Sequence, residues 1–389
     1  MEINEYSQRI AALQSGLQAK GLEGALLTAF TDIYYFTGSR QNSVLWVPAS
    51  APAVLLARKS FTRAKADSPW LDVRPFASRG DFSGAVPAGL GKAGLVFNGL
   101  SAQLYKYYSG LMPGAELSDI AAIVRDLRSV KSASEQELLR ESAKRLSGVF
   151  SLVPEFLKPG MTEQEAGAAF EYRSRLAGNE GCRMRAPIGE NFIGVAVSGA
   201  SAGQPGYFDG AVTGPGLSPA SPVGASLKRL ENDSPFFLDY TFMYNGYIAD
   251  MTRIFVFGKL PALLLKAYET SFEIHQYLAE NMKPGNNGEA LYRKALELAA
   301  KAGLAENFMG VPGENARFVG HGVGLELDET PVLCAGAKAP LVAGNVVAIE
   351  PKFIFPGLGA VGIENTFIIG PSGAERITGP GSGIIYPGS

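Results

Sequence analysis

The sequence predicts a two-domain α+β protein, in which a small α/β domain precedes a larger domain built from two similar α/β halves. Three observations carry this prediction. With 389 residues, the chain exceeds what one ordinary hydrophobic core holds, so two domains are expected. Short apolar runs alternate with helical segments as far as about residue 128. Beyond that point, one pattern recurs at an offset of 125 residues.

The first domain is predicted to span residues 1–130. The run GALLT at 24–28 is typical of a buried strand, and it follows a helical pattern that ends at Gly21. Two further apolar runs, at 44–47 and 53–57, are bounded by Pro and Ser, as short strands are. These residues favour a small α/β domain.

The second domain is predicted to span residues 131–389 and to open with a long amphipathic helix, capped by the box Ser134-x-x-Glu137. Lys-Pro-Gly occurs in it at 158–160 and again at 283–285, each time before a helical stretch. Common turn chemistry is one explanation of this repeat. The other is two similar halves that face each other across a cleft, where small-molecule sites are usually found.

The composition is that of a globular protein and argues against several kinds of partner. The formal net charge is −2, so neither nucleic acid nor an anionic membrane is expected to bind. The acidic N-terminal residues do not suggest a signal peptide, and no apolar run reaches the roughly 18 residues of a membrane span. Cys182 and Cys334 lack metal-ligand spacing, which fits a reducing compartment, so a cytoplasmic location is expected.

Only two histidines, His275 and His321, occur in the chain. A site of three histidines is therefore excluded within one chain, and any metal site must rely mainly on carboxylate oxygens. Such ligands favour hard divalent ions such as Mn²⁺ over a closed zinc site. His275 lies in an apolar helical stretch and is expected to be structural.

The segment 236–258 reads as a hairpin around Asn245-Gly246, a dipeptide typical of a two-residue turn. In that register Thr241 faces Asp250, and Asp239 faces Thr252, so both aspartates lie on one face of the ladder. Two carboxylates this close repel each other unless they are protonated or bound to a cation. Taken singly, each aspartate is also compatible with an ordinary strand-end or turn residue.

Two later segments add a histidine and two acids. His321 lies between glycines, where the backbone can approach a site closely, and Glu350 and Glu364 each interrupt an apolar strand. With a four-residue loop at 356–359, unbroken pairing would put the two glutamates on opposite faces. An odd-length loop or a β-bulge is therefore predicted near glycines 357, 359 or 362.

These segments resemble the creatinase/aminopeptidase P/prolidase family, the "pita-bread" metallohydrolases. The matching motifs are Asp239…Gly246-Tyr247-x-x-Asp250-Met251-Thr252-Arg253, Gly320-His321-Gly322-Val323-Gly324-Leu325, Glu350-Pro351 and Ile363-Glu364-Asn365-Thr366. Earlier cues, Tyr35-Phe36-Thr37-Gly38 among them, extend the resemblance over nearly the whole chain.

The resemblance implies a creatinase-like N-terminal domain, a pita-bread C-terminal domain with pseudo-twofold α/β halves, and two divalent metal ions. Mn²⁺ is expected first, with Co²⁺, Fe²⁺ or Zn²⁺ as alternatives. Asp239 would bind one ion, His321 and Glu350 the other, and Asp250 and Glu364 both. Glu350 would also shuttle a proton. Relatives are often dimers, so a homodimer is expected.

Outside the metal ligands, the sequence departs from the family's peptidases. Gly206, Arg317 and Asp328 stand where the family has histidines, and Gly362 where it has an arginine. Candidate replacement groups for holding a substrate are Arg183, Arg185, Tyr207, Arg317 and Asp328. Arg183 and Arg185 could bind a carboxylate together, although solvent-exposed arginines are the other interpretation. Arg253 is expected to brace the hairpin.

The first functional prediction is a dinuclear metal-dependent hydrolase resembling Xaa-Pro dipeptidase or aminopeptidase P, in which a metal-activated water attacks the amide carbonyl of a small peptide. The second is C–N cleavage of a non-peptide metabolite, as in creatinase. The third is a non-catalytic metal-binding or interaction module, against which the intact set of five ligands argues.

Overall fold

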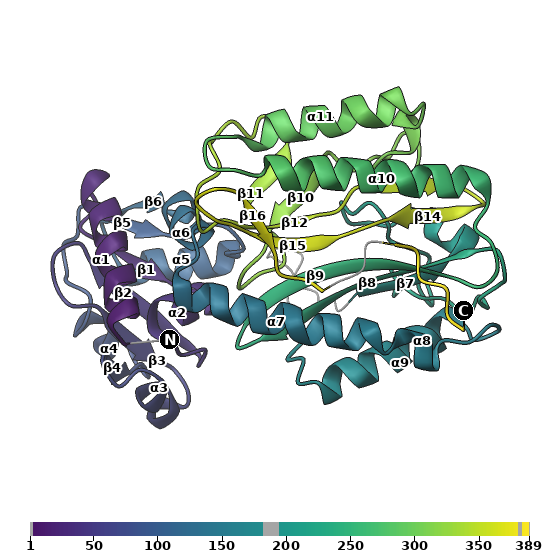
Figure 1. Ribbon diagram of the computed structural model, residues 1–389. Coiled ribbons are helices and arrows are strands. Elements are labelled where there is room, and N and C mark those ends of the chain that lie inside the picture. Colours follow the sequence, from purple (N-terminus) through teal and green to yellow (C-terminus); the bar gives the residue numbers. More distant parts are fainter. Residues whose placement is uncertain (1–2, 182–193, 380–382, 389) are drawn as a thin grey trace. The chain divides into compact units, whose positions relative to one another are not determined.

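The computed structural model describes residues 3–181, 194–379 and 383–388. They form two compact units, one made of residues 3–128 and the other beginning at Ser129. Both units mix helices and strands, which confirms the predicted fold class (Figure 1). None of the helices in the described ranges combines the length and the apolar character that crossing a membrane requires.

The N-terminal unit contains a six-stranded mixed sheet of order β4-β3-β2-β1-β5-β6. Strand β1 pairs antiparallel with β2 and parallel with β5. The three predicted apolar runs form β1, β2 and β3. The strands are β1 Gly24–Leu27, β2 Ser43–Pro48, β3 Val54–Ala57, β4 Asp72–Pro75, β5 Lys92–Leu95 and β6 Glu116–Asp119. The helices are α1 Ile3–Ala19, α2 Phe30–Thr37, α3 Phe61–Asp67, α4 Arg79–Ser83, α5 Ala102–Leu111 and α6 Ala121–Ser129.

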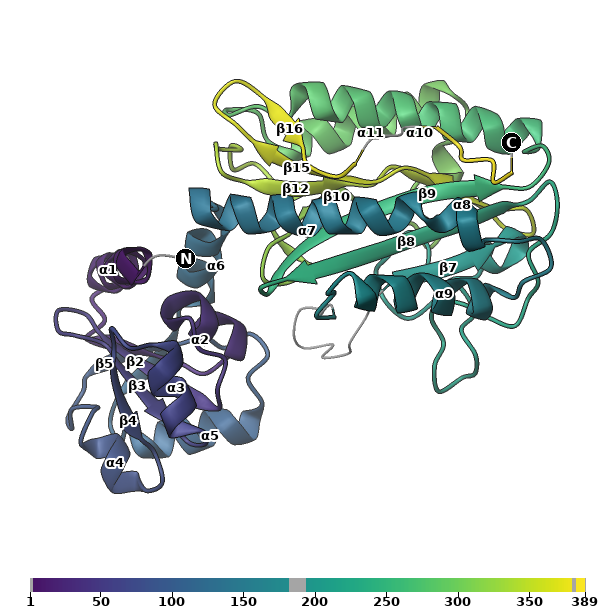
Figure 2. The same ribbon diagram turned by 60° about the horizontal axis from the view of Figure 1, so that its bottom comes forward.

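The second unit places its strands between two helical layers, α7 to α9 on one side and α10 and α11 on the other (Figure 2). The first half contains α7 Ala133–Ser151, α8 Val153–Phe156, α9 Glu163–Leu176, β7 Gly194–Ser198, η1 Gly199–Gly203, β8 Pro235–Tyr244 and β9 Tyr247–Val256. The second half contains α10 Ala262–Asn281, α11 Gly288–Lys301, η2 Ala305–Asn307, β10 Phe318–Gly322, β11 Glu329–Cys334, β12 Val346–Ile349, β13 Lys352–Phe355, β14 Gly359–Gly362, β15 Asn365–Ile369 and β16 Ala374–Arg376.

The sequence repeat corresponds to equivalent helices in the two halves. Thr162 caps α9 and Asn287 caps α11, at the 125-residue offset of the Lys-Pro-Gly motifs. The long helix α7 begins after Ser132, whose hydroxyl accepts from the backbone N–H of Glu135. The predicted box at Ser134 was therefore wrong by two residues, because Ser132-x-x-Glu135 fits the same pattern.

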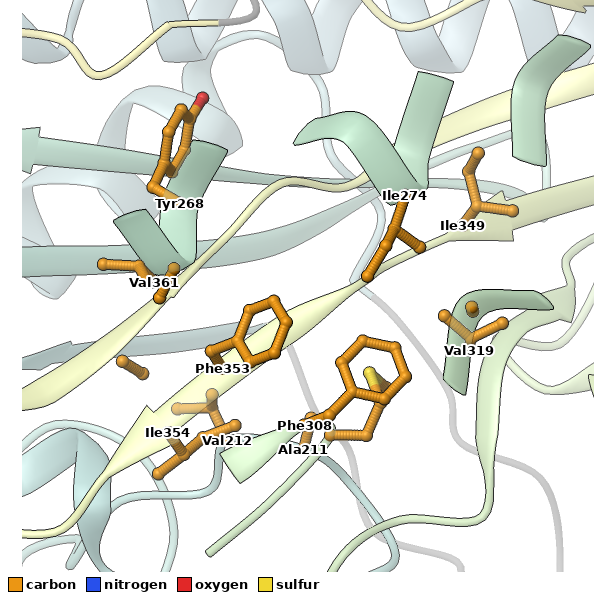
Figure 3. Packing of buried hydrophobic residues seen from close by; sticks show 14 of the residues in the cluster. Ala211, Val212, Tyr268, Ile274, Phe308, Val319, Ile349, Phe353, Ile354 and Val361 are labelled. Carbon is orange, nitrogen blue, oxygen red and sulfur yellow. The ribbon is translucent and has the colours of Figure 1, made fainter. Parts of the chain in front are cut away.

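The strands of the second unit pack differently on their two faces. On β8, Phe236, Leu238 and Tyr240 pack with α7 and α9, whereas Phe237 faces the core of the second half. In that core, Phe353 of β13 packs against Phe308, at 5.2 Å between ring centroids, under Ile274 of α10 (Figure 3). Side chains on the inner face of β8 and β9 therefore point toward the strands of the second half.

Candidate metal centre

The two aspartates lie on the inner face of the β8–β9 hairpin. The ladder pairs Tyr244 with Tyr247, Thr241 with Asp250, and Asp239 with Thr252, which confirms the predicted register. Asn245 and Gly246 both have positive φ, 47° and 80°, as a two-residue turn of this type requires. The turn thus places both carboxylates on one face.

The two glutamates lie opposite each other in the second hairpin. Strand β13 pairs with β14 so that Phe355 faces Gly359, which leaves a three-residue loop. The predicted odd-length loop is therefore confirmed. The ladder of β12 and β15, in which Ile349 faces Asn365, keeps the same register. Glu350 and Glu364 consequently point to the same face and can share one site.

His321 comes from β10, beside β12 in the same sheet, where it faces Ala348. Its Nδ1 lies 3.2 Å from the carbonyl oxygen of Gly322, which can only accept a hydrogen bond. The proton therefore lies on Nδ1 in the neutral ring, and the lone pair of Nε2 is directed at the acids. Nε2 is 3.4 Å from Glu350 Oε1, 3.9 Å from Glu364 Oε1 and 4.0 Å from Asp250 Oδ2.

A buried arginine joins the two hairpins. Thr252 and Glu364 form an isolated bridge between β9 and the residue before β15. The Arg253 guanidinium donates to the carbonyl of Glu364 at 2.9 Å and to the Asn365 side chain at 2.8 Å. The Asn365 amide in turn lies 3.0 Å from Nε2 of His275, whose pKa burial lowers to about 3. Arg253 braces the site, and His275 is a neutral structural residue, as predicted.

One carboxylate oxygen at the centre has no hydrogen-bond partner. Glu364 is 1% exposed, and its Oε2 accepts from the Thr252 hydroxyl at 2.8 Å, but its Oε1 is buried without a partner. A buried oxygen left this way destabilises the fold unless a cation or water satisfies it. Oε1 faces His321 and Asp250, so the missing partner belongs between these three side chains.

A lysine that the sequence analysis did not single out completes the cluster. Lys352, at the start of β13, is 2% exposed. Its ammonium donates to Asp239 Oδ2 at 2.7 Å, Glu350 Oε2 at 2.5 Å and Glu364 Oε2 at 3.0 Å. The signal was present in the sequence, because residues two apart on a strand share a face and Lys352 follows Glu350 by two.

The electrostatics of the cluster are those of crowded acids. Burial, and then the charges of Glu364 and Asp239, raise the pKa of Asp250 well above its usual range. Burial opposes the charge of Lys352, but Asp239, Glu350 and Glu364 outweigh it and raise the pKa of the ammonium. Both shifts have the same cause, which is that several carboxylates are buried close together around one ammonium group.

The side chains fit one divalent ion. Ligand atoms bound to one ion at roughly 2.0–2.2 Å lie no more than about 4.4 Å apart. His321 Nε2 meets this condition with Asp250, Glu350 and Glu364. One atom from each of Asp250, His321 and Glu364 lies within 4.8 Å of the others. One imidazole with carboxylates is a donor set that Mn²⁺, Fe²⁺, Co²⁺ and Zn²⁺ accept.

A second ion at Asp239 does not fit this arrangement. Asp239 Oδ2 already accepts a hydrogen bond from the Lys352 ammonium at 2.7 Å, so the ammonium lies where a second ion would have to approach. A metal ion at this carboxylate would lie close to the Lys352 ammonium, and two positive charges at such a short distance repel each other strongly. The expected pair of ions thus conflicts with the position of Lys352.

Comparison with known proteins identifies the family. The chain matches the family model for metallopeptidase family M24 over residues 137–371. It belongs to this family. Residues 9–130 match the creatinase/prolidase N-terminal domain, so the resemblance found in the sequence is confirmed in both parts. Membership of a metallopeptidase family implies a divalent metal ion.

Relatives of this M24 chain match it along most of their length. It is 28% identical to the probable dipeptidase PepE of Mycobacterium bovis, covering 98% of this chain and 97% of that protein. It is also 28% identical to an Xaa-Pro dipeptidase of Pyrococcus furiosus, over 68% of this chain and 67% of that protein. The Xaa-Pro dipeptidase structure from Bacillus anthracis has the same fold, with a TM-score of 0.84 at 23% identity, and 98% and 99% of the two chains are covered.

A pocket of about 550 Å³, including its open mouth, leads to the cluster. Asp328, one of the candidates for holding a substrate, lines it together with Asp209. Tyr207 and Arg317 are exposed and do not line it. Arg183 and Arg185 lie outside the described residues. The remaining lining is largely apolar and comes from Val195, Phe208, Ala211, Val212, Phe318 and Leu327.

Proposed function

We propose that this chain is a metal-dependent hydrolase that cleaves the amide bond of a small peptide carrying a free amino group. The observation that carries the proposal is the unpartnered Glu364 Oε1, buried beside His321 and Asp250 at the end of a pocket. Names of relatives, dipeptidase and Xaa-Pro dipeptidase, support an amide as the bond that is cut.

Asp250, His321, Glu350 and Glu364 would hold the ion, with Mn²⁺ as the first candidate because three of the four ligands are carboxylates. When bound, such an ion lowers the pKa of a ligated water and polarises a carbonyl. Glu350 would also accept a proton from that water and later return it to the leaving amine, the role expected from the family resemblance. The His321 Nδ1 contact to Gly322 keeps Nε2 aimed at the site.

The pocket lining favours a positively charged substrate end. Among the described lining residues, the only basic side chains are His321 and Lys352, and both already contact carboxylates. Asp209 and Asp328 line the same pocket and are exposed to solvent. A free α-amino group can pair with these acids, whereas the terminal carboxylate of a dipeptide meets like charge.

The same acidic lining favours a second candidate, a small cationic amide or amidine cut at a C–N bond. Such a substrate would use the charge of Asp209 and Asp328 without presenting a peptide. A non-catalytic binding module, the third alternative, would bind metal and turn over none of these compounds.

A substrate screen of the Mn²⁺-loaded protein tests the proposal. We expect cleavage of longer Xaa-Pro peptides with a free amine, and weak or no cleavage of Ala-Pro and Met-Pro. Losing one transition-state donor typically costs about 10²–10³ in turnover, and three histidines of the family's peptidases are replaced. Cleavage of Ala-Pro at about 10 per second would instead make the chain an ordinary prolidase. If none of the compounds in the screen is cleaved, the proposal that this chain is a hydrolase is contradicted.

Asp328→Asn isolates the contribution of the acidic lining. We expect a several-fold higher KM for a free-amine substrate and an unchanged KM for its N-acetylated counterpart, because only the former carries the charge. The acetylated substrate is thus an internal control. Equal effects on both substrates would assign Asp328 a role in shaping the pocket instead.

Three further proposals concern the chain as a whole. We propose domain limits of 1–130 and 131–389, a cytoplasmic location and a homodimer. Limited proteolysis, fractionation of cells and sedimentation velocity would test them in turn.

A further inference from the structure

We propose that the ammonium group of Lys352 takes the place of a second metal ion, so that this chain holds a single divalent ion. The inference rests on the proposed function, because it keeps the ion at His321 and changes only what lies at Asp239. A dinuclear centre was the expectation from family resemblance, and the side chains of this chain argue against it.

The ammonium group is saturated by its surroundings. An alkylammonium has three N–H donors and no acceptor. Lys352 Nζ contacts three carboxylate oxygens, one from each of Asp239, Glu350 and Glu364, at 2.7, 2.5 and 3.0 Å. Each donor therefore has an acceptor of opposite charge, as a buried lysine requires. The ammonium therefore occupies the space between these three carboxylates that a second cation would need.

The glutamate oxygens divide into two sets. Oε2 of Glu350 and Oε2 of Glu364 both accept from Lys352. Oε1 of each residue faces His321, at 3.4 and 3.9 Å. Each glutamate thus bridges two neighbouring cation positions, as a bridging ligand does between two metals. One position holds the ammonium, and the other is where Glu364 Oε1 has no partner.

The opposite strand leaves room for the lysine. Lys352 faces Gly362 across the β13–β14 ladder. A Cβ at position 362 would lie 2.7 Å from Lys352 Cγ and 2.7 Å from the carbonyl oxygen of Pro351, both closer than side chains tolerate. Gly362 stands where the resembled peptidases have an arginine. In this register position 362 therefore has no space for a side chain, and the stem of Lys352 packs directly beside Gly362.

The strand also fixes the direction of the lysine. Phe353, the next residue on β13, packs against Phe308 in the core of the second half (Figure 3). Neighbouring side chains on a strand point to opposite faces, so Lys352 points away from that core, to the carboxylates. If Lys352 turned outward, Asp239 would lose its hydrogen bond. The two glutamates would then repel each other without a cation between them.

The replacement has a chemical consequence. A metal ion accepts electron pairs from water or a carbonyl, whereas an ammonium only donates hydrogen bonds. Since all three donors of Lys352 are used, it balances charge and positions the glutamates and has no N–H left to donate to a substrate. Lys352 is therefore a positioning residue, and only one position in the pocket can ligate a substrate group.

Metal counting on the wild-type protein tests the inference without relying on turnover. The full-length protein is stripped with a chelator, loaded with excess Mn²⁺, desalted and analysed for metal per chain. We expect one Mn²⁺ per chain and the electron paramagnetic resonance spectrum of an isolated ion. Two ions with the spectrum of an exchange-coupled pair would overturn the inference and leave the proposed hydrolase standing. No bound ion would overturn both.

Two variants test the role of Lys352. Lys352→Ala should bind two ions per chain, because it frees the oxygens of Asp239, Glu350 and Glu364. Asp239→Asn in the wild-type background should still bind one ion, whereas a dinuclear centre would lose one of two. A single ion in Lys352→Ala would overturn the assignment of Lys352. If that variant fails to fold, the Asp239→Asn count and the wild-type spectrum decide.

Discussion

Asp250→Asn should raise the melting temperature of the metal-free protein and lower that of the Mn²⁺-loaded protein. The substitution keeps the Oδ1 atom, which accepts from the backbone N–H of Met251 at 2.9 Å. It replaces Oδ2, the oxygen 4.0 Å from His321 Nε2, with an NH₂ group, which cannot ligate a cation. The same change thus removes both a repelling charge and a metal ligand.

The metal-free effect follows from the pKa of Asp250. An unfolded aspartate loses its proton near 3.8, whereas burial and neighbouring acids raise the pKa in the fold. Between these two pKa values the folded state binds more protons, so stability falls as pH rises. Because the raised pKa makes ionisation of Asp250 less favourable in the fold than in the unfolded chain, the metal-free fold loses stability as pH rises above the unfolded pKa, and asparagine, which does not titrate, removes that effect.

The metal-bound effect follows from linkage. At a Mn²⁺ concentration of 1,000 times Kd, binding stabilises a protein by about 4 kcal/mol, and a variant that has lost a ligand loses most of this. Thermal melts with chelator and with Mn²⁺ measure the two opposite changes in melting temperature. The turnover of the variant should fall to background. Glu306→Gln, an exposed carboxylate-to-amide change, is the matched control and should change neither melt. Lower melting temperatures in both states would contradict a metal-binding role for Asp250.

Lys352→Met should destabilise the metal-free protein strongly. Methionine keeps most of the side-chain volume, so the change removes the charge without opening a large cavity. Taking one partner from a buried ion pair costs about 3–5 kcal/mol, and here three carboxylates lose their shared cation. For a unit of this size, we expect the melting temperature to fall by on the order of 10 °C.

A surface lysine supplies the control for this experiment. Lys338 is exposed, and Lys338→Met should change stability by no more than about 0.5 kcal/mol. Both variants are melted in chelator, so that metal binding does not contribute. Equal melting temperatures for Lys352→Met and wild type would show that the ammonium does not lie between the carboxylates in solution.

Local patterns were enough to predict the two hairpins. The Asn245-Gly246 turn determines the β8–β9 register, and the parity of the loop after Phe355 follows from the need to bring Glu350 and Glu364 to one face. Both are properties of short stretches of chain. The position of His321 between glycines is compatible with a ligand, but the family motif around it carried that assignment.

Features that depend on distant contacts were not predicted. Alternation places Lys352 on the face of Glu350, but only the approach of β8 to β13 shows that Asp239 also reaches its ammonium. The capping box was misplaced because Ser132 and Ser134 are both followed three residues later by glutamate. Tyr207 lies in a segment without periodic pattern, so its exposure could not be inferred from sequence.

Anomalous diffraction from crystals grown with Mn²⁺, collected at the manganese absorption edge, tests the single-ion centre most directly. We predict one anomalous peak, bonded to His321 Nε2 with Asp250, Glu350 and Glu364 around it, and the Lys352 ammonium still hydrogen-bonded to Asp239. Two peaks with Lys352 displaced from Asp239, or no peak at His321, would contradict this centre.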